Sequence, residues 1–177
     1  AHGLLRGPSR FRILGVVDDR HAGRDAGEVV DGRVRRIPCF AALDEALAAL
    51  PEPPDWLIVG VAFHGGRMPE AMRGMVLEGV RRGIGAVNGL HQLLADDPEI
   101  AAAAAASGAR LHDIRRIPKF AELRFWTGEA LALAVPRVAV LGNDCALGKR
   151  TTATFLLDGL RRRGLTAELV TTGLAGW

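Results

Sequence analysis

Short apolar runs alternate with amphipathic stretches along the first two thirds of the chain. The apolar runs predict buried strands at residues 11–18, 34–37, 56–62, 84–88 and 110–114. Helical spacing of apolar positions predicts helices at 40–50, 70–82 and 90–107, the last broken near Pro98. Strands that alternate with helices form a parallel sheet covered by helices. We therefore predict an α/β fold, with a Rossmann-like parallel sheet domain over residues 1–130.

The rest of the chain, residues 131–177, predicts the start of a second domain. A strand at 137–141, a glycine-rich turn, a helix from about 149 to 163 and a strand at 166–171 make one βαβ unit. One such unit cannot bury both faces of its sheet, so we expect a P-loop domain that continues beyond Trp177. We expect the 177-residue chain alone to be inactive for the same reason.

The first six residues are typical of the last turn of a helix. This indicates that the first strand of the Rossmann-like unit precedes Ala1, and that the run at 11–18 is its second strand. Asp18 at the end of that run then either binds a ribose hydroxyl or caps the turn that follows.

Composition narrows the classes of partner. Of 23 cationic side chains only Lys119 and Lys149 are lysines, and the formal charge of +3 comes from scattered arginines with few aromatic residues among them. This argues against a nucleic-acid surface. No apolar run reaches the ~18 residues of a membrane span. Cys39 and Cys145 are isolated, which favours a reducing cytoplasm. We expect a small-molecule substrate, and a homo-oligomer in the full-length protein.

The glycine-rich turn at 142–151 carries the clearest chemistry. Backbone N–H groups of such a turn converge on phosphate oxygens, and the next helix directs its positive end to the same anion. Lys149 adds a compact charge on a flexible stem. The predicted phosphate-binding residues are Gly142, Asn143, Asp144, Cys145, Gly148, Lys149, Arg150 and Thr151. The alternative is an ordinary strand-to-helix turn with a chance Gly-Lys pair.

The turn departs from the usual P-loop in two ways. Five residues separate Gly142 from Gly148, and Arg150 stands where a serine or threonine is usual. The longer gap, with Asp144 inside it, resembles the P-loop of dethiobiotin-synthetase-like enzymes. The hydroxyl that normally binds Mg²⁺ is then either displaced to Thr151 or lost, and Arg150 itself can bind phosphate.

Six short strings together resemble one bacterial family, long catalogued only as a domain of unknown function. They lie at residues 1–6, 22–28, 60–66, 88–91, 113–115 and 142–152. The family has an N-terminal Rossmann-like domain and a C-terminal P-loop domain, and its members are about twice as long. Where it usually shows Asp-x-Arg followed by Lys-Pro, this chain has Arg116-Ile117-Pro118-Lys119.

The family includes a D-glutamate N-acetyltransferase, so the resemblance implies transfer of acetyl from acetyl-CoA to an amino acid. Such a reaction needs a base, for which His64, His91 and Asp113 are candidates near strand ends. Each also has a structural interpretation. His64 can cap a turn, His91 can be a structural residue in the first turn of a helix, and Asp113 can form an ion pair with Arg115. The arginines that could bind substrate carboxylates are Arg24, Arg67 and Arg115.

Two other functions remain open from the residues. An ATP-dependent ligase or kinase would use the same P-loop with ATP and Mg²⁺, and would need an acidic metal ligand on a later strand. A nucleotide-binding regulatory protein would bind its ligand without turnover. The sequence thus leaves acetyl-CoA or ATP as the cofactor.

Overall fold

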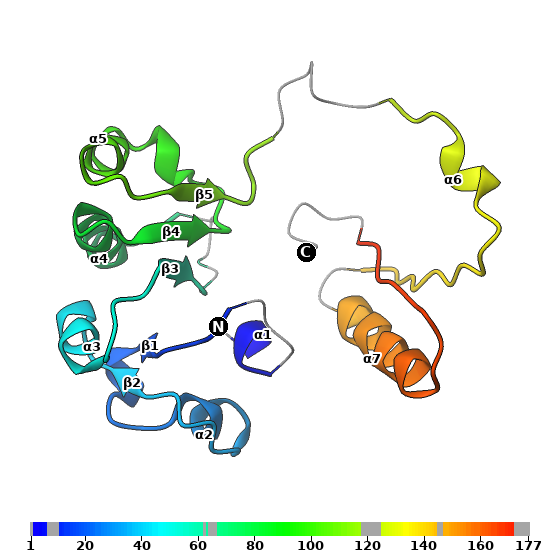
Figure 1. Cartoon of the computed structure of the whole chain (residues 1–177), viewed down its shortest axis with the longest axis horizontal. Helices are drawn as coiled ribbons and strands as arrows, with labels where there is room; N and C mark the ends of the chain where they lie inside the picture. Colours follow the sequence, from blue (N-terminus) through cyan, green and yellow to red (C-terminus); the bar gives the residue numbers. More distant parts are fainter. Residues whose placement is uncertain are drawn as a thin grey trace. The chain divides into compact units, whose positions relative to one another are not determined.

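The computed structural model describes residues 2–6, 11–61, 63, 67–117, 125–144 and 147–171. The chain divides into two compact units, Ala1–Arg116 and Ile117–Trp177 (Figure 1). The sequence-based boundary between residues 130 and 131 stays a prediction.

The described residues of the first unit form two parallel sheets. In one, β1 (Val16–Val17) pairs with β2 (Cys39–Phe40). In the other, β4 (Gly85–Asn88) lies between β3 (Trp56–Val59) and β5 (Leu111–Asp113). All three pairings are parallel, which confirms the predicted α/β class. The carboxyl ends of β3, β4 and β5 therefore meet at one edge of their sheet.

The helices of this unit are mostly short. Before β3 the chain forms α1 (His2–Arg6), the 3₁₀ turn η1 (Asp19–His21), α2 (Ala26–Asp31) and α3 (Leu43–Ala49). After β3 come α4 (Glu70–Arg81), η3 (Leu94–Asp96) and α5 (Pro98–Ser107). The predicted helix over 90–107 thus divides at Pro98, because the Asp97 carboxylate accepts the N–H groups of Glu99 and Ile100 and starts a new helix there.

The main core lies between α4, α5 and the sheet of β3, β4 and β5. Val80 and Ala86 are fully buried in it, and α4 and α5 pack side by side in Figure 1. Gly79 lets α4 approach β3 closely, since a Cβ there would stand 2.2 Å from Leu57 Cδ1. Burial of this apolar surface holds the sheet edge in place for the loops that follow it.

A cavity of about 560 Å³ lies between the two sheets. It is lined by residues 11–17 on one side and 56–61 on the other, with side chains of α3 and α4. No strand among the described residues joins β1 to β3, so the described part of this unit has two sheets, not the single sheet that the sequence predicted.

The predicted strand at 34–37 is wrong. Val34 is 67% exposed, and pairing with β1 occurs instead at Cys39 and Phe40. The reason lies in Asp25, whose carboxylate accepts the N–H groups of Arg35 (3.0 Å) and Ile37 (2.9 Å). These donors are used by a side chain rather than by a ladder. The run at 11–18 likewise contracts to the two residues of β1.

The second unit contains α6 (Glu129–Ala132) and α7 (Lys149–Arg162). The predicted helix after the glycine turn is confirmed, but the predicted strands at 137–141 and 166–171 are wrong: the described residues there form no strand. Val138 is 71% and Val170 86% exposed. A strand needs a ladder partner for its backbone groups, and neither run pairs with another segment among the described residues of this unit. No described helix combines the length and apolar character needed to cross a membrane.

Candidate functional site

Polar side chains end the two strands at the middle and edge of the β3–β4–β5 sheet. Asn88 is the last residue of β4 and is fully buried. Its Nδ2 donates to Asp113 Oδ1 and to the Gln92 carbonyl, both at 2.8 Å, and its Oδ1 accepts the Leu90 N–H at 3.0 Å. Asn88 therefore folds the loop that follows β4 back onto the sheet edge.

Asp113, the last residue of β5, completes this buried network. Its Oδ1 accepts the Leu94 N–H at 2.8 Å and its Oδ2 accepts the Ala95 N–H at 3.0 Å, so it holds the start of η3. Its side chain is 1% exposed. These contacts give Asp113 a clear structural part, while its action as a base stays a prediction.

The two arginines that follow Asp113 in the chain make their hydrogen bonds to other residues. Arg115 Nε donates to the Gly89 carbonyl at 2.6 Å, which ties the loop after β5 to the loop after β4. Arg116 Nη2 binds Asp96 at 2.7 Å and lies 3.9 Å from Asp113 Oδ2. Asp113 thus has Arg116, rather than the expected Arg115, as its neighbouring cation among the described ion pairs.

The loop after β3 joins the same edge. The Met68 N–H donates to Gln92 Oε1 at 3.1 Å, while the Met68 side chain is buried in the core. Arg67 precedes Met68 and is exposed. His64, the candidate base in this loop, lies outside the described residues. Hydrogen bonds thus link the loops that follow β3, β4 and β5. These loops carry Arg67, His91 and Arg115, and Asp113 is the last residue of β5.

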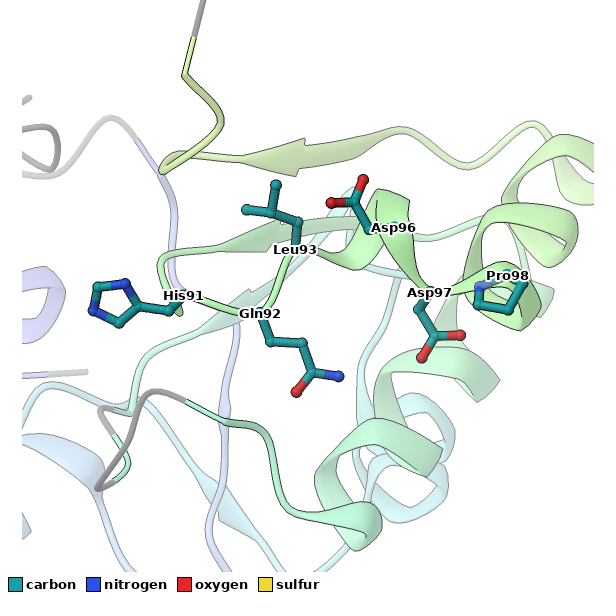
Figure 2. A pocket seen from close by; sticks show the side chains of 6 residues that line it. All are labelled: His91, Gln92, Leu93, Asp96, Asp97 and Pro98. Atoms are coloured by element: carbon teal, nitrogen blue, oxygen red, sulfur yellow. The ribbon is translucent and has the colours of Figure 1, made fainter.

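An open cavity of about 490 Å³ borders the loop after β4 (Figure 2). Its lining residues are His91, Gln92, Leu93, Asp96, Asp97 and Pro98. In Figure 2 the Gln92 amide and the Asp97 carboxylate point to the same side of the loop, and the His91 ring points away from them at its far end. His91 is exposed, as a base that meets a substrate must be. Asp97 binds Arg73 through two bonds, Nε–Oδ2 at 2.7 Å and Nη2–Oδ1 at 2.8 Å. These bonds, with those from the backbone N–H groups of Ile100 and Glu99, lower the Asp97 pKa to about 2.

Arg24 lies in the loop between η1 and α2, beside the sheet of β1 and β2. Its N–H donates to His21 at 3.1 Å, and its carbonyl accepts the Cys39 N–H at 2.9 Å. Nearby, Asp18 accepts the Arg20 N–H at 3.2 Å and contacts His21 Nδ1 at 2.8 Å. Asp18 therefore caps η1. Of the two roles that the sequence predicted for Asp18, this is the cap of the following turn. The structure places Arg24 beside this sheet and not on the three linked loops.

The glycine turn lies in the second unit, before α7. Gly148 is the N-cap residue of α7 and adopts a left-handed conformation (φ 84°), which glycine tolerates. Lys149 Nζ donates to the Asp144 carbonyl, and a Cβ on Gly142 would stand 3.0 Å from Lys149 Cδ. The lysine stem thus lies back along the turn. Cys145 lies outside the described residues.

These features fit an anionic group. The first N–H groups of α7 point out of the start of the helix, and Lys149 and Arg150 stand in its first turn. Thr151 is exposed in the same turn, and its binding of Mg²⁺ stays a prediction. The described residues hold no cluster of three acidic, histidine or cysteine groups suited to a metal. That observation does not bear on a magnesium ion held by one threonine, water and phosphates.

The fold and the glycine turn define an α/β protein that combines a Rossmann-like domain with a P-loop domain. Residues 19–117 match the family model described as the Rossmann-like domain of DUF1611, and residues 124–177 match its P-loop domain. The chain belongs to the DUF1611 family, as the short strings in its sequence indicate.

Two relatives carry a functional name. A protein of Tritonibacter scottomollicae named D-glutamate N-acetyltransferase is 31% identical over 76% of this chain and 38% of its own length. A Pseudoalteromonas protein of the same name is 27% identical over 67% of the chain and 35% of its length. The chain therefore spans less than half the length of these relatives.

A solved structure agrees with the fold. The crystal structure of a DUF1611 family protein from Anabaena variabilis superposes with a TM-score of 0.82 at 31% identity. The alignment covers 98% of this chain and 48% of that one.

Sequence reasoning missed Asn88 and Gln92 as parts of the site. A polar residue that ends an apolar run, as Asn88 does, is the signal that could have found the first. Nothing local marks Gln92, because its partner Met68 is 24 residues away in the sequence.

Proposed function

We propose that this protein transfers the acetyl group of acetyl-CoA to the amine of D-glutamate or a similar amino acid. The observation that carries this proposal is the similarity to two proteins named D-glutamate N-acetyltransferase, at 31% and 27% identity. The P-loop domain and the linked loops of the first unit supply chemistry that such a reaction needs.

The P-loop is proposed to hold the phosphates of coenzyme A. A pyrophosphate presents oxygens to the first N–H groups of α7, and the Lys149 ammonium balances the charge. Acetyl-CoA supplies an activated acetyl thioester. The Lys149 ammonium has three N–H donors, so it can bond a phosphate oxygen while one donor stays on the Asp144 carbonyl.

The loops after β3, β4 and β5 are proposed to hold the amino acid. Arg67 and Arg115 bind its carboxylates, and His91 removes the proton from its ammonium so that the nitrogen lone pair can attack. The new bond is the amide C–N bond, the bond broken is the thioester C–S bond, and the departing thiolate takes up a proton. The exposed His91 ring beside the 490 Å³ cavity supports this assignment.

The spacing of the P-loop favours a second candidate, an ATP-dependent ligase or kinase. Five residues between Gly142 and Gly148 resemble the turn of dethiobiotin-synthetase-like enzymes. In that case Thr151 binds Mg²⁺ and phosphate is released from ATP.

A two-arm assay of the full-length protein separates these functions. One arm supplies acetyl-CoA with D-glutamate, L-glutamate or neither and follows free thiol. The other supplies ATP and Mg²⁺ with the same amino acids and follows phosphate. Thiol release that depends on D-glutamate supports the acetyltransferase, whereas phosphate release without thiol moves the protein to the ATP-dependent class. Silence in both arms leaves a binding protein and contradicts the proposal.

A further inference from the structure

We propose that Gln92 is a positioning residue that holds the Arg67 loop in place and thereby selects a dicarboxylic amino acid. The inference rests on the proposed function, because it assigns Arg67 and Arg115 to the two carboxylates of that substrate.

The main chain of Gln92 is held by the buried side chain of Asn88. Its carbonyl accepts Asn88 Nδ2 at 2.8 Å, and Asn88 is fully buried with its other polar contacts to Asp113 and Leu90. Buried polar groups whose partners are all satisfied are rigid, because any movement leaves a donor or acceptor unpaired. Gln92 therefore projects its side chain from a fixed point.

That side chain reaches across to the loop after β3. Gln92 Oε1 accepts the Met68 N–H at 3.1 Å, and the Met68 side chain is anchored in the core beside Val76 and Leu90. Met68 is thus fixed by the core through its side chain and by Gln92 through its backbone. Arg67, the next residue toward the N-terminus, is exposed and takes its starting direction from this anchor.

A second tether holds the other arginine. Arg115 Nε donates to the Gly89 carbonyl at 2.6 Å, three residues before Gln92 in the same loop. The loop over residues 89–92 therefore bonds Arg115 directly and fixes the backbone of Met68, the residue after Arg67. Two arginines whose chain positions are set by one loop favour a substrate with two carboxylates over one with a single carboxylate. Gln92 is the only link from this loop to Met68 among the described hydrogen bonds.

The test replaces Gln92 by leucine, which keeps the size of the side chain and removes the acceptor. A matched control is Ser107→Ala, because Ser107 Oγ also joins two elements by bonding the Val80 carbonyl at 2.6 Å and the Ala109 N–H at 3.2 Å. Both variants lose a side-chain bond to backbone, but only Gln92→Leu changes the three linked loops. Full-length protein is assayed with D-glutamate and with D-norvaline, which lacks the second carboxylate.

For Gln92→Leu we expect the KM for D-glutamate to rise about tenfold, with kcat within about threefold and the KM for acetyl-CoA unchanged. The preference for D-glutamate over D-norvaline falls with it. Amide hydrogen exchange at Met68 speeds up about tenfold in Gln92→Leu and is unchanged in Ser107→Ala.

The outcomes separate the two proposals. An unchanged KM and preference in Gln92→Leu, or the same change in Ser107→Ala, overturns the positioning inference while the acetyltransferase stands. If the wild-type protein transfers no acetyl group, the proposed function fails and so does selection of the substrate. Exchange at Met68 then still decides whether Gln92 holds the loop, and unchanged exchange overturns that as well.

Discussion

At the scale of single residues, the polar side chains of this protein divide into buried ones that hold loops and exposed ones that are available to ligands. Asn88 and Asp113 have their hydrogen bonds met by the protein and are buried. His91 and Arg67 are exposed on the loops that these residues hold. The position of Asp113 at the end of β5 is thus explained by the loop that its carboxylate holds. A catalytic role for Asp113 needs separate evidence.

Asp113→Asn tests the loop-holding part. The new amide keeps one acceptor, but its NH₂ group faces an N–H donor of Leu94 or Ala95 that then stays unpaired. We expect the free energy of unfolding to fall by about 2 kcal/mol, because a buried donor loses its partner. Urea unfolding measures the change. Asp96→Asn is the control, since Asp96 is exposed and its loss should cost less than about 1 kcal/mol. Equal effects of the two variants would show that Asp113 does not hold η3.

Lys149→Ala tests the phosphate site. Removal of the ammonium should weaken binding of coenzyme A about 10- to 100-fold, because a charged hydrogen bond to phosphate is lost. Titration calorimetry on the full-length protein measures the affinity. Arg162→Ala removes an equal charge at the opposite end of α7 and should leave the affinity within about twofold. Equal weakening by both variants would mean that net charge, and not the turn, attracts the ligand.

At the scale of elements, local signals predicted the helices better than the strands. Asp97, Pro98 and Gly108 mark both ends of α5 in the sequence, since caps and breakers act within a few residues. Strands depend on partners that the sequence does not mark. The N–H groups of Arg35 and Ile37 donate to the Asp25 carboxylate instead of to a neighbouring strand. The runs at 137–141 and 166–171 pair with no strand in the part of the chain that the structure describes.

The same contrast holds for the candidate site. The P-loop could be predicted because Gly148 and Lys149 act through adjacent backbone. The link from Gln92 to Met68 could not be predicted, since it depends on how β3 and β4 pair in register.

A pair of glycine substitutions tests the account of the helix ends. Gly108 ends α5 with φ 77°, and a Cβ at this position would have no atom within 4 Å. The only cost of Gly108→Ala is therefore the strain of an alanine in the left-handed conformation. We expect a loss of about 1 kcal/mol in the free energy of unfolding. Gly74 lies inside α4 with equally open space, so Gly74→Ala should stabilise by up to about 1 kcal/mol. Thermal unfolding should show shifts of opposite sign; a shift of the same sign in both would contradict the assignment of Gly108 as a left-handed cap.

Acid stability tests the contact between α4 and α5. The Arg73 guanidinium, together with the backbone N–H groups of Ile100 and Glu99, lowers the pKa of Asp97 from 3.8 to about 2. A lowered carboxyl pKa stabilises the folded state fully above pH 4, and that contribution is lost as the pH falls from about 4 to about 2. Arg73→Met should therefore be less stable than wild type at pH 6, and the difference should shrink toward pH 2. Urea unfolding across this range measures it. A difference that is constant with pH would contradict the ion pair as its cause.

At the scale of the whole molecule, the two units contribute different parts of the proposed reaction. The first unit links loops that carry candidate groups for an amino acid, and the second carries a turn suited to phosphates. Two relatives of this chain are named D-glutamate N-acetyltransferase, and the chain covers 38% and 35% of their lengths. The central claim therefore concerns the full-length protein.

The most direct test is the initial rate of thiol release from acetyl-CoA by that protein, with D-glutamate present or absent. We predict release that requires D-glutamate, is lost in Lys149→Ala and is retained in Arg162→Ala, with N-acetyl-D-glutamate identified as the product. No release with D-glutamate, or release equally fast in Lys149→Ala, would contradict an acetyltransferase that holds its donor at the P-loop.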